Sequence, residues 1–511
     1  MRNECRDETT AADTVLTGGR VHTVDAADRV REALAIRDGR IARVGTADEV
    51  APLIGRTTRV VDLAGASVLP GINDSHLHGV WLGAMWPRLL MDQLTAPGHG
   101  RPEPGAAGPS RLEGSAERRA AILRTQELLA SLGVTSYTEP GLGPGEDAGA
   151  SGCFSSGALR DYADLAAEGL LTARVTALML FGELDGPSTL DALLDGLRDF
   201  KPPRDVPGWF RVAGVKIFAD GIPPMSTAWT DEPYADGTGH GSLLIAPLDA
   251  PSPGYGTGPG YGTGPGYGTG PGYGTGERRS AGAVGESAGD GEDDRRGKAF
   301  SLMVRAAHAA GYQVGVHATG GRATRAAVEA MRAAMAADGR WGARHYVIHG
   351  DVLRPGTLAA MAEAGIGLNT QAGIAVATED MLVGALGERV LPDAWPVRDT
   401  LAARAVLCLS SDAPVLSPDW RAGLAAAVTR KGADGRVRGP AQRLSVAQAL
   451  RAYTIAPAWQ DGAEAWKGSL EEGKTADLCV LGGDLLDTEP DAIPQLPIQM
   501  TMIGGHVIHE A

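Results

Sequence analysis

Ala66-Ser67-Val68-Leu69-Pro70-Gly71-Ile72-Asn73-Asp74-Ser75-His76-Leu77-His78 is the stretch that decides the fold, an apolar run that ends in two histidines. Side chains on a strand alternate between its two faces, so His76 and His78 point the same way and can reach one metal ion. With 11 histidines in 511 residues, chance gives about 0.24 His-x-His pairs. Requiring an acid two positions earlier lowers that number to about 0.03. The pentad Asp74–His78 therefore predicts a metal site if later segments supply further ligands.

The bulk composition limits the classes of protein and partner. A chain of 511 residues with 43% hydrophobic content is long enough for a large barrel and an accessory domain. Its net charge of −15 argues against a nucleic acid or an anionic membrane as partner. No stretch approaches the roughly 18 apolar residues that a membrane span needs.

The N-terminus and the cysteines predict a cytoplasmic protein. Residues 1–8 are polar and contain no apolar signal core. The four cysteines are scattered without CxxC spacing, which predicts reduced thiols and no disulfide framework: Cys5, Cys153, Cys408 and Cys479.

Both ends of the chain are rich in short strand-like segments. An Asp38-Gly39 pair between alternating apolar residues is a hairpin signal near the N-terminus. Residues 478–481 and 497–503 are strand-like near the C-terminus. We predict that residues 13–68 and 465–511 form one small composite β-sandwich domain.

The middle of the chain, residues 69–464, alternates strand-like runs with helical stretches. This alternation predicts parallel βαβ units and an α/β fold, a (β/α)8 TIM barrel. After the first strand, the predicted strands are 134–139, 173–180, 214–219, 313–317, 345–349, 366–370 and 405–410. The clearest predicted helices are 117–132 and 322–337.

One segment does not suit a barrel. The hexad Pro-Gly-Tyr-Gly-Thr-Gly repeats four times over residues 253–276, and a Gly/Ser/acidic stretch follows. Such a composition cannot bury a core, so we predict a disordered surface insertion over residues 247–297. A lid or docking arm that uses the tyrosines is the functional alternative.

Four further polar side chains stand at the ends of predicted barrel strands. Lys216 interrupts the apolar strand 214–219, His317 and His349 close the next two strands, and Asp412 follows the last one. Catalytic groups of such barrels lie on the face formed by the carboxyl ends of the strands. Together with His76 and His78, these residues form a ligand set for one or two divalent ions.

The order HxH, Lys, His, His, Asp resembles the amidohydrolase superfamily. Residues 69–78 look like its LPGFIDSHVH motif, and residues 468–478 resemble its closing GSLxPGKxADL motif. Residues 215–221, 317–323 and 411–415 are similar to the YtcJ-like branch, which includes N-substituted formamide deformylases. The resemblance implies a metal-bearing (β/α)8 barrel with a composite β-sandwich from both termini.

The chain departs from this family in two places. The segment between the first two barrel strands is shorter than usual, and residues 97–115 within it are rich in Gly and Pro. The usual HxxGD after the fifth-strand histidine reads His317-Ala318-Thr319-Gly320-Gly321, without the acid. Both departures concern the substrate pocket and leave every predicted metal ligand in place.

The metal set predicts a hydrolytic mechanism. A divalent ion lowers the pKa of bound water toward ~7, so a metal-bound hydroxide can attack a carbonyl carbon. Asp412 would accept the water proton and pass it to the leaving nitrogen as general acid/base. Zinc is the first expectation, although His/carboxylate sites also bind iron, manganese or nickel. The resemblance implies that CO2 carboxylates Lys216 to a carbamate bridging two ions; an unmodified lysine implies one ion.

Four more residues are predicted near the metal as supporting or substrate-contacting groups. Asp74 is expected to accept a hydrogen bond from the histidine pair. Glu139 could be a pocket acid or a solvated loop acid, and Arg322 and Gln371 are candidate substrate contacts. Simpler roles stay open too: Lys216 could pair with Asp220, and Asp412 could form a turn.

The sequence therefore predicts a metal-dependent hydrolase that cleaves a non-peptide carbon–nitrogen bond in a small amide, N-acyl or N-formyl amine. One alternative is an aminohydrolase that deaminates a heterocycle, which Lys216 and the missing acid after His317 disfavour. The other is a catalytically silent regulatory barrel. A homodimer is the base-rate expectation for the assembly.

Overall fold

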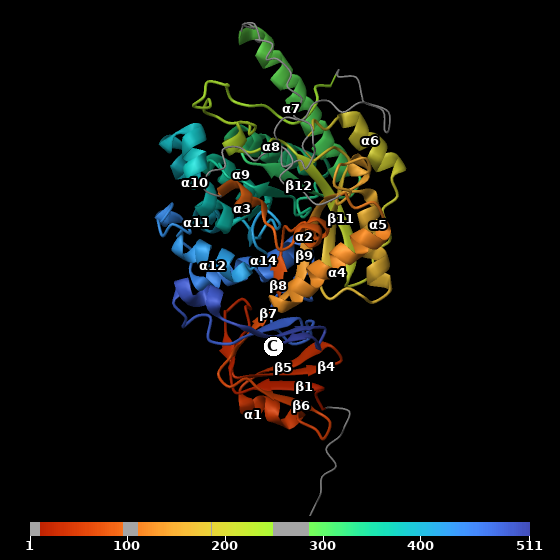
Figure 1. Ribbon diagram of the computed structural model, residues 1–511, viewed down its shortest axis with the longest axis vertical. Helices are drawn as coiled ribbons and strands as arrows, with labels where there is room; N and C mark the ends of the chain where they lie inside the picture. The colour runs from red at the N-terminus through yellow and green to blue at the C-terminus, as the bar shows by residue number, and fades with distance from the viewer. Residues whose placement is uncertain (1–10, 96–110, 185, 249–285) are drawn as a thin grey trace, which may run out of the picture.

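The structure is a computed structural model that describes residues 11–95, 111–184, 186–248 and 286–511. A barrel forms the larger body, and a smaller β-rich body built from both ends of the chain lies against one end of it (Figure 1). Within the described residues, eight parallel strands follow one another in chain order around the barrel. They are β8 (Ile72–Asp74), β9 (Val134–Leu142), β10 (Arg174–Leu180), β11 (Phe210–Phe218), β12 (Gln313–Ala318), β13 (Tyr346–His349), β14 (Gly367–Thr370) and β15 (Leu407–Leu409). The predicted α/β barrel is confirmed.

The opening stretch joins the two bodies. It was predicted as one strand but splits at Gly71 into β7 (Ser67–Pro70), which lies in the β-rich body, and β8, which lies in the barrel. A Cβ atom at Gly71 would collide with the side chain of Thr135 on β9, so only glycine permits this close approach.

The segment after β8 brings the first and last strands together. The backbone amide of Asp412 donates to the carbonyl of His76 at 2.9 Å, and that of His78 donates to the carbonyl of Ala413 at 2.9 Å. The Ser75 hydroxyl donates to the carbonyl of Leu409 at 3.0 Å. The pentad that carries the histidines therefore also bridges the two ends of the barrel sheet.

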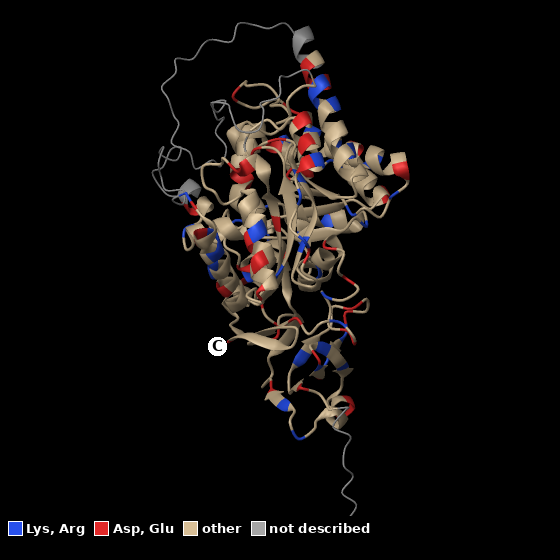
Figure 2. Cartoon of the chain, turned by 90° about the vertical axis from the view of Figure 1, so that its right-hand side faces the viewer, with Lys and Arg blue, Asp and Glu red and all other residues tan. Residues whose placement is uncertain are grey.

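Helices cover the outside of the barrel, and most of the charged residues lie on these helices and on the loops, whereas the strands are largely uncharged (Figure 2). The predicted helices 117–132 and 322–337 correspond to α4 (Ser115–Ser131) and α8 (Gly321–Asp338). The others in and around the barrel are α2 (Gly79–Met85), α3 (Leu90–Thr95), α5 (Ser156–Ala167), α6 (Leu190–Asp199), α7 (Glu286–Ala309), α9 (Pro355–Ala364), α10 (Ala372–Leu386), α11 (Val397–Ala402), α12 (Trp420–Thr429), α13 (Val446–Ala452) and α14 (Ile455–Gln460).

Two sheets form the β-rich body. The first has the order β5-β4-β1-β6 and comes from the N-terminal segment: β1 (Thr14–Thr17), β4 (Ala33–Arg37), β5 (Arg40–Gly45) and β6 (Arg59–Asp62). The second has the order β18-β17-β16-β7-β2-β3 and combines both ends: β2 (Arg20–His22), β3 (Val30–Arg31), β16 (Leu478–Leu481), β17 (Ile498–Ile503) and β18 (His506–Glu510). A short helix, α1 (Ala47–Val50), follows β5. The composite body is thus present.

The predicted hairpin at Asp38-Gly39 is confirmed. Strands β4 and β5 pair antiparallel, and the two turn residues have φ values of 52° and 71°. Positive φ at both positions is the geometry that an Asp-Gly turn supplies.

Part of the predicted disordered insertion is ordered. The repeat at residues 253–276 lies outside the described residues, but residues 286–297, predicted as disordered, begin helix α7. The guanidinium of Arg296 donates to the carbonyl of Ile245 at 2.7 Å and pairs with Glu292 one turn earlier. The compositional argument missed this anchor because it depends on one arginine and a carbonyl 51 residues away.

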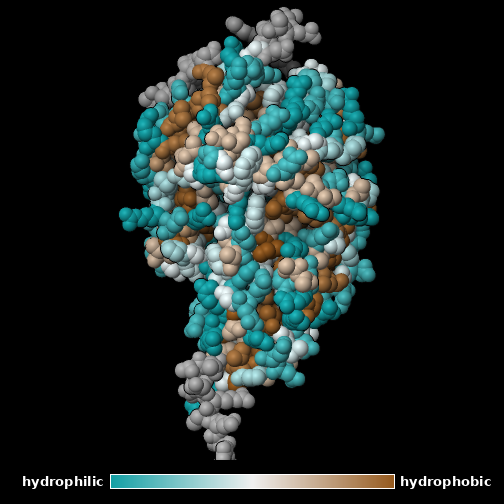
Figure 3. Space-filling view, turned by 180° about the vertical axis from the view of Figure 1, so that it is seen from behind, coloured by the Kyte–Doolittle hydropathy of each residue, from teal (hydrophilic) through white to brown (hydrophobic). Residues whose placement is uncertain are grey.

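The surface mixes polar and apolar residues. The face seen from behind is mainly hydrophilic, with apolar patches interspersed (Figure 3). None of the helices in the described part of the chain has the length and apolar character needed to cross a bilayer.

Candidate metal centre

The predicted ligands come from the carboxyl ends of five barrel strands. His76 and His78 follow β8, and Asp412 follows β15. Lys216 and His317 lie near the ends of β11 and β12, and His349 is the last residue of β13. All six side chains are buried, with exposed fractions between 1% and 8%. The structure therefore places these six side chains at the carboxyl ends of barrel strands, as the sequence predicts.

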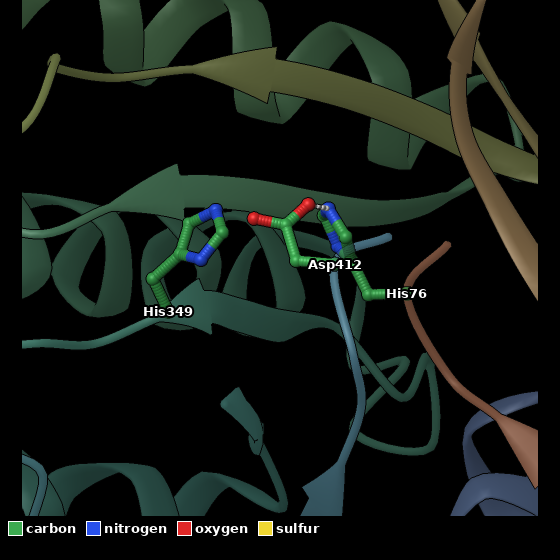
Figure 4. Close-up of side chains that lie close together, drawn as sticks. All are labelled: His76, His349 and Asp412. Atoms are coloured by element: carbon green, nitrogen blue, oxygen red, sulfur yellow. Dashed lines mark ion pairs between the residues drawn. The ribbon is translucent and has the colours of Figure 1, made fainter. Parts of the chain in front are cut away.

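Three of the six form a compact group. One potential ligand atom from each of His76, His349 and Asp412 lies within 4.8 Å of the others. His349 and His76 flank the Asp412 carboxylate, and Oδ1 of Asp412 lies 3.2 Å from Nε2 of His76 (Figure 4). This is the only such His/Cys/Asp/Glu group in the described part of the chain.

The other three predicted ligands lie beside this group. Nε2 of His78 is 3.5 Å from Oδ1 of Asp412, and the rings of His317 and His349 are 4.5 Å apart between centroids. The Lys216 ammonium nitrogen lies 4.7 Å from the centroid of the Phe218 ring. The site is therefore one cluster in which Asp412 is surrounded by histidines.

Two residues of the compact group have left-handed backbone conformations. His349 has a φ of 71° and Asp412 a φ of 57°, both in the left-handed region that side chains other than Gly, Asn and Asp rarely adopt. Such conformations persist only where the surrounding structure over-determines them, and they concentrate at functional sites. Here they turn both side chains toward the shared centre.

Burial sets the protonation states of the cluster. It lowers the pKa of His349 to about 4 and the pKa values of His76 and His317 well below their ordinary value of 6.5. Burial opposes ionisation of Asp412, but the neighbouring His76, His78 and His349 outweigh it and hold the pKa of that carboxyl well below 3.8. Burial alone would lower the pKa of His78, but Asp412 and Glu139 outweigh it and raise that pKa above 6.5. Neutral imidazoles at His76, His317 and His349 beside an ionised carboxylate are the forms in which these groups bind metals.

The residues present fit a divalent cation. Nδ1 of His76 is buried and has no hydrogen-bond partner among the described residues. Buried polar atoms without a partner are rare and point to a missing water or ion. Imidazole nitrogens and carboxylate oxygens are the ligands of zinc and related ions.

Asp74 contacts backbone amides instead of the imidazoles predicted for it. Its Oδ1 accepts from the backbone N–H groups of His76 at 3.3 Å and Ser411 at 3.1 Å. Burial raises its pKa to about 7. Asp74 therefore ties Ser411, two residues after β15, to the HxH segment rather than orienting a ring.

Glu139 lies beside His78, the second histidine of the HxH pair. It is buried on β9, its Oε1 lies 3.5 Å from Nδ1 of His78, and its Oε2 accepts from the Tyr162 hydroxyl at 2.9 Å and the Gly79 amide at 2.6 Å. The solvated loop role is excluded. The sequence could not decide this because the tyrosine and the α2 amide reach Glu139 only in the folded chain.

The two candidate substrate contacts differ. Oε1 of Gln371 lies 2.8 Å from Nδ1 of His349, so Gln371 contacts the cluster directly. Arg322 begins helix α8 half-buried, and its backbone amide donates to the carbonyl of Trp229. His345, directly before β13, bonds to His308 and is not part of the cluster.

Two acids near the cluster were not predicted as site residues, although Asp220 was named as a possible partner of Lys216. Asp220 follows β11 and accepts from the backbone amides of Trp229, Thr319 and Gly320, while Asp351 follows His349 and accepts from the Trp395 indole. Burial raises the pKa of each to about 7. Both acids lie two residues after a strand that carries a predicted ligand, and this position could have indicated from the sequence that they belong near the site.

The missing acid of the HxxGD pattern has a structural explanation. A Cβ atom at Gly321 would collide with the carboxylate of Asp231. Asp231 is held there by Arg325 at 3.0 Å and Arg354 at 3.3 Å. An acid from another segment thus occupies the space next to residue 321.

Comparison with known proteins agrees with this geometry. The sequence profile of the amidohydrolase family, type Amidohydro_3, matches residues 103–509. The amidohydrolase YtcJ of Bacillus subtilis is 29% identical over 212 residues, 41% of this chain and 39% of YtcJ. The N-substituted formamide deformylase of Arthrobacter pascens is 30% identical over 163 residues, 32% of this chain and 30% of the deformylase. The matched segments thus span well under half of either relative.

A solved structure shares the fold over almost the full length. An uncharacterized metal-dependent hydrolase from Pyrococcus horikoshii superposes with a TM-score of 0.66 at 19% identity, covering 94% of this chain and 99% of that one. At this identity the likeness concerns the fold alone. Because the family profile spans most of the chain, the protein belongs to the amidohydrolase family.

Proposed function

We propose that the protein is a metal-dependent hydrolase that cleaves a carbon–nitrogen bond outside peptides, in a small amide, N-acyl amine or N-formyl amine. The observation that carries the proposal is the buried group of His76, His349 and Asp412 at the carboxyl ends of the barrel strands. The similarity to a formamide deformylase supports N-formyl amines as the first substrate class to test.

The cluster would hold one or two divalent ions. His76, His349 and Asp412 form the core of the ligand set, and His78, His317 and Lys216 lie around it. When bound, a divalent ion lowers the pKa of a water molecule and polarises the carbonyl group of the substrate. Zinc is the first candidate for a set of imidazoles and one carboxylate.

Asp412 is the group that would move the proton. Its pKa lies well below neutral pH, so at pH 7 its carboxylate can accept a proton from water and deliver it to the leaving nitrogen. Its Oδ1 already lies 3.2 Å from His76 and 3.5 Å from His78, so the carboxylate is held in place before substrate binds.

Glu139 would orient the ring of His78. Its own position is fixed by the Tyr162 hydroxyl and the Gly79 amide, and it lies 3.5 Å from Nδ1 of His78. A carboxylate beside a ligating imidazole is the usual means of fixing the ring orientation of a metal-binding histidine.

Lys216 would supply a ligand only after modification. Its amine is 2% exposed, and no hydrogen bond or ion pair reaches it from the described residues. An uncharged amine attacks CO2, its nitrogen forms a bond to carbon and loses a proton, and the product is an anionic carbamate. Such a carbamate would allow two ions, whereas a free amine would allow one.

Metal content and a substrate panel test this proposal. Purified protein should contain a divalent metal, lose activity on chelation and recover it on metal addition; no metal before or after reconstitution contradicts the proposal. The panel should compare N-formyl and N-acyl amines with nucleobase-like heterocycles and Xaa-Pro dipeptides. Ammonia release from a heterocycle would favour a deaminase, and dipeptide cleavage would refute the restriction to non-peptide bonds.

A further inference from the structure

A buried line of polar side chains leads from His349 into the interior of the barrel. Gln371 Oε1 lies 2.8 Å from His349 Nδ1, and Gln371 Nε2 lies 2.9 Å from Ser410 Oγ. Ser410 Oγ in turn lies 2.8 Å from Asn369 Oδ1. Gln371, Ser410 and Asn369 are 2% exposed or less. Barrel interiors are usually filled with branched apolar side chains, so this polar line needs a physical reason.

The backbone carbonyl of Ser75 determines which groups donate and which accept along this line of hydrogen bonds. Asn369 Nδ2 lies 2.8 Å and Gln460 Nε2 lies 3.1 Å from this oxygen. A carbonyl oxygen can only accept hydrogen bonds, so both amide groups must turn their NH2 groups toward it. The Oδ1 atom of Asn369 consequently faces Ser410, where it can only accept.

The hydrogen-bond roles of Ser410, Gln371 and His349 are then fixed. The Ser410 hydroxyl must donate its single hydrogen to Asn369, so it accepts from the NH2 group of Gln371. Oε1 of Gln371 is left facing His349 and accepts from Nδ1. A neutral imidazole carries one N–H, so Nε2 of His349 keeps its lone pair free.

We propose that Ser410, Asn369 and the Ser75 carbonyl form a positioning relay that acts through Gln371 and fixes His349 in the Nδ1–H tautomer, with Nε2 as its metal-binding atom. The inference rests on the metal-dependent function proposed above. Amide groups do not pass protons along such a line, so the relay sets an orientation and does not conduct protons. It links the HxH pentad, which contains Ser75, to a ligand at the end of β13.

Ser410→Ala is the decisive variant because Ser410 does not contact His349. The change removes the hydroxyl that holds the Gln371 amide, so this amide can turn and present its NH2 group to the ring. In metal-free protein labelled with 15N-histidine, we expect the His349 nitrogen shifts to move away from the Nδ1–H pattern, with His349→Gln identifying the signal. Metal affinity, measured by chelator competition, should fall by about 10- to 100-fold.

A pair of variants at Gln371 provides a second test. Gln371→Glu keeps an acceptor opposite Nδ1, so the tautomer and the metal affinity should stay near those of the wild type. Gln371→Leu removes the acceptor, so the Nδ1–H tautomer should no longer be fixed and the metal affinity should fall. Gln442→Leu is the control: it removes a buried amide oxygen that accepts from the Arg398 and Asp399 amides away from the site. It should lower stability and leave both readouts unchanged.

Two results would overturn the relay. One is a Ser410→Ala protein with unchanged His349 nitrogen shifts and unchanged metal affinity; should this variant not fold, Asn369→Leu takes its place, with the same criterion. The other is equal behaviour of Gln371→Glu and Gln371→Leu. Failure of the proposed function looks different, because a wild-type protein that binds no metal would still show the Nδ1–H tautomer.

Discussion

The Asp412 carboxylate lies 3.2 Å from Nε2 of His76, and the Asp412 backbone amide donates to the His76 carbonyl at 2.9 Å. The same two residues therefore link the first and last strands of the barrel and bring two candidate metal ligands together. The contacts that connect the two ends of the barrel sheet are therefore also contacts of the candidate site.

Asp412→Asn should separate catalysis from folding. The amide has the shape of the carboxylate and keeps the backbone link to His76, but it cannot act as a base at neutral pH. We expect turnover of any substrate found in the panel to fall by about 10²- to 10⁴-fold. Because the lowered pKa of Asp412 means that its carboxylate stabilises the fold at neutral pH, metal-free Asp412→Asn should unfold at a lower urea concentration than the wild type while still folding. A folded variant with full turnover would remove Asp412 from the proton-transfer role.

Lys216→Met should stabilise the metal-free protein at neutral pH. Burial lowers the pKa of Lys216 to about 7 from an ordinary value of 10.5. Between these pH values the unfolded chain holds a proton that the folded chain has released, so the stability of the wild type rises with pH across this window. The advantage of the variant should be largest at pH 7 and shrink toward pH 10.5. Urea denaturation across this range would measure it, and a constant difference would contradict the cause given.

The same variant reports on the number of metal ions. If a carbamate on Lys216 allows two ions, reconstituted wild-type protein should hold close to two per chain and Lys216→Met close to one. Reconstitution with and without added bicarbonate, followed by metal analysis, checks this. Equal metal content in both proteins would show that Lys216 is not a ligand.

A buried histidine pair predicts a loss of stability in acid. Nδ1 of His345 accepts from the Val314 amide, so its Nε2–H must donate to Nδ1 of His308, and Nε2–H of His308 then donates to Asp338. Burial, His308 and Arg340 lower the pKa of His345 to about 3, with Asp338 opposing them. The ring of His345 is therefore neutral in the folded protein at neutral pH.

The sign of this pH dependence follows from the lowered pKa. As pH falls from 6.5 toward 3, the unfolded chain binds a proton at His345 and the folded chain does not, so stability is lost. The slope should be about 1.4 kcal/mol per pH unit for this one group. In His345→Gln the slope between pH 6 and 4 should be shallower by about this amount in chemical denaturation, and an unchanged slope would refute the assignment.

The ion pair between Arg174 and Asp477 joins the barrel to the β-rich body. Two hydrogen bonds of 2.7 and 2.8 Å connect them, and the guanidinium lies between the rings of Trp209 and Trp466. Lysine cannot reproduce either the paired hydrogen bonds or the stacking, and breaking a buried pair costs about 3–5 kcal/mol. Arg174→Met removes the cation and should therefore approach this loss in urea denaturation, whereas Arg174→Lys keeps the charge and should lose less.

The matched control for this ion pair is on the surface. Arg198 pairs with Asp199 in the exposed end of α6, where solvent screens the attraction between the two charges. Arg198→Ala should thus change stability little. Similar losses in Arg174→Met and Arg198→Ala would show that burial of Arg174 is not what makes its pair important.

The sequence by itself determined the barrel and the set of residues that meet at its mouth. Strand–helix alternation predicts parallel strands, and parallel strands bring His76, His349 and Asp412 to one edge because all of them end there. The side-chain period of two in a strand was enough to pair His76 with His78. These rules depend only on the residues within each strand and on the order of strands and helices, not on contacts between distant segments.

Tertiary structure alone decided what surrounds the ligands. Glu139 became the partner of His78, and Asp74 turned to backbone amides, because of contacts with Tyr162 and Ser411 from distant segments. The tautomer proposed for His349 depends on the Ser75 carbonyl, which no local pattern connects to it. Hydrogen bonds have direction, and the partner that sets the direction is known only when segments hundreds of residues apart are packed together.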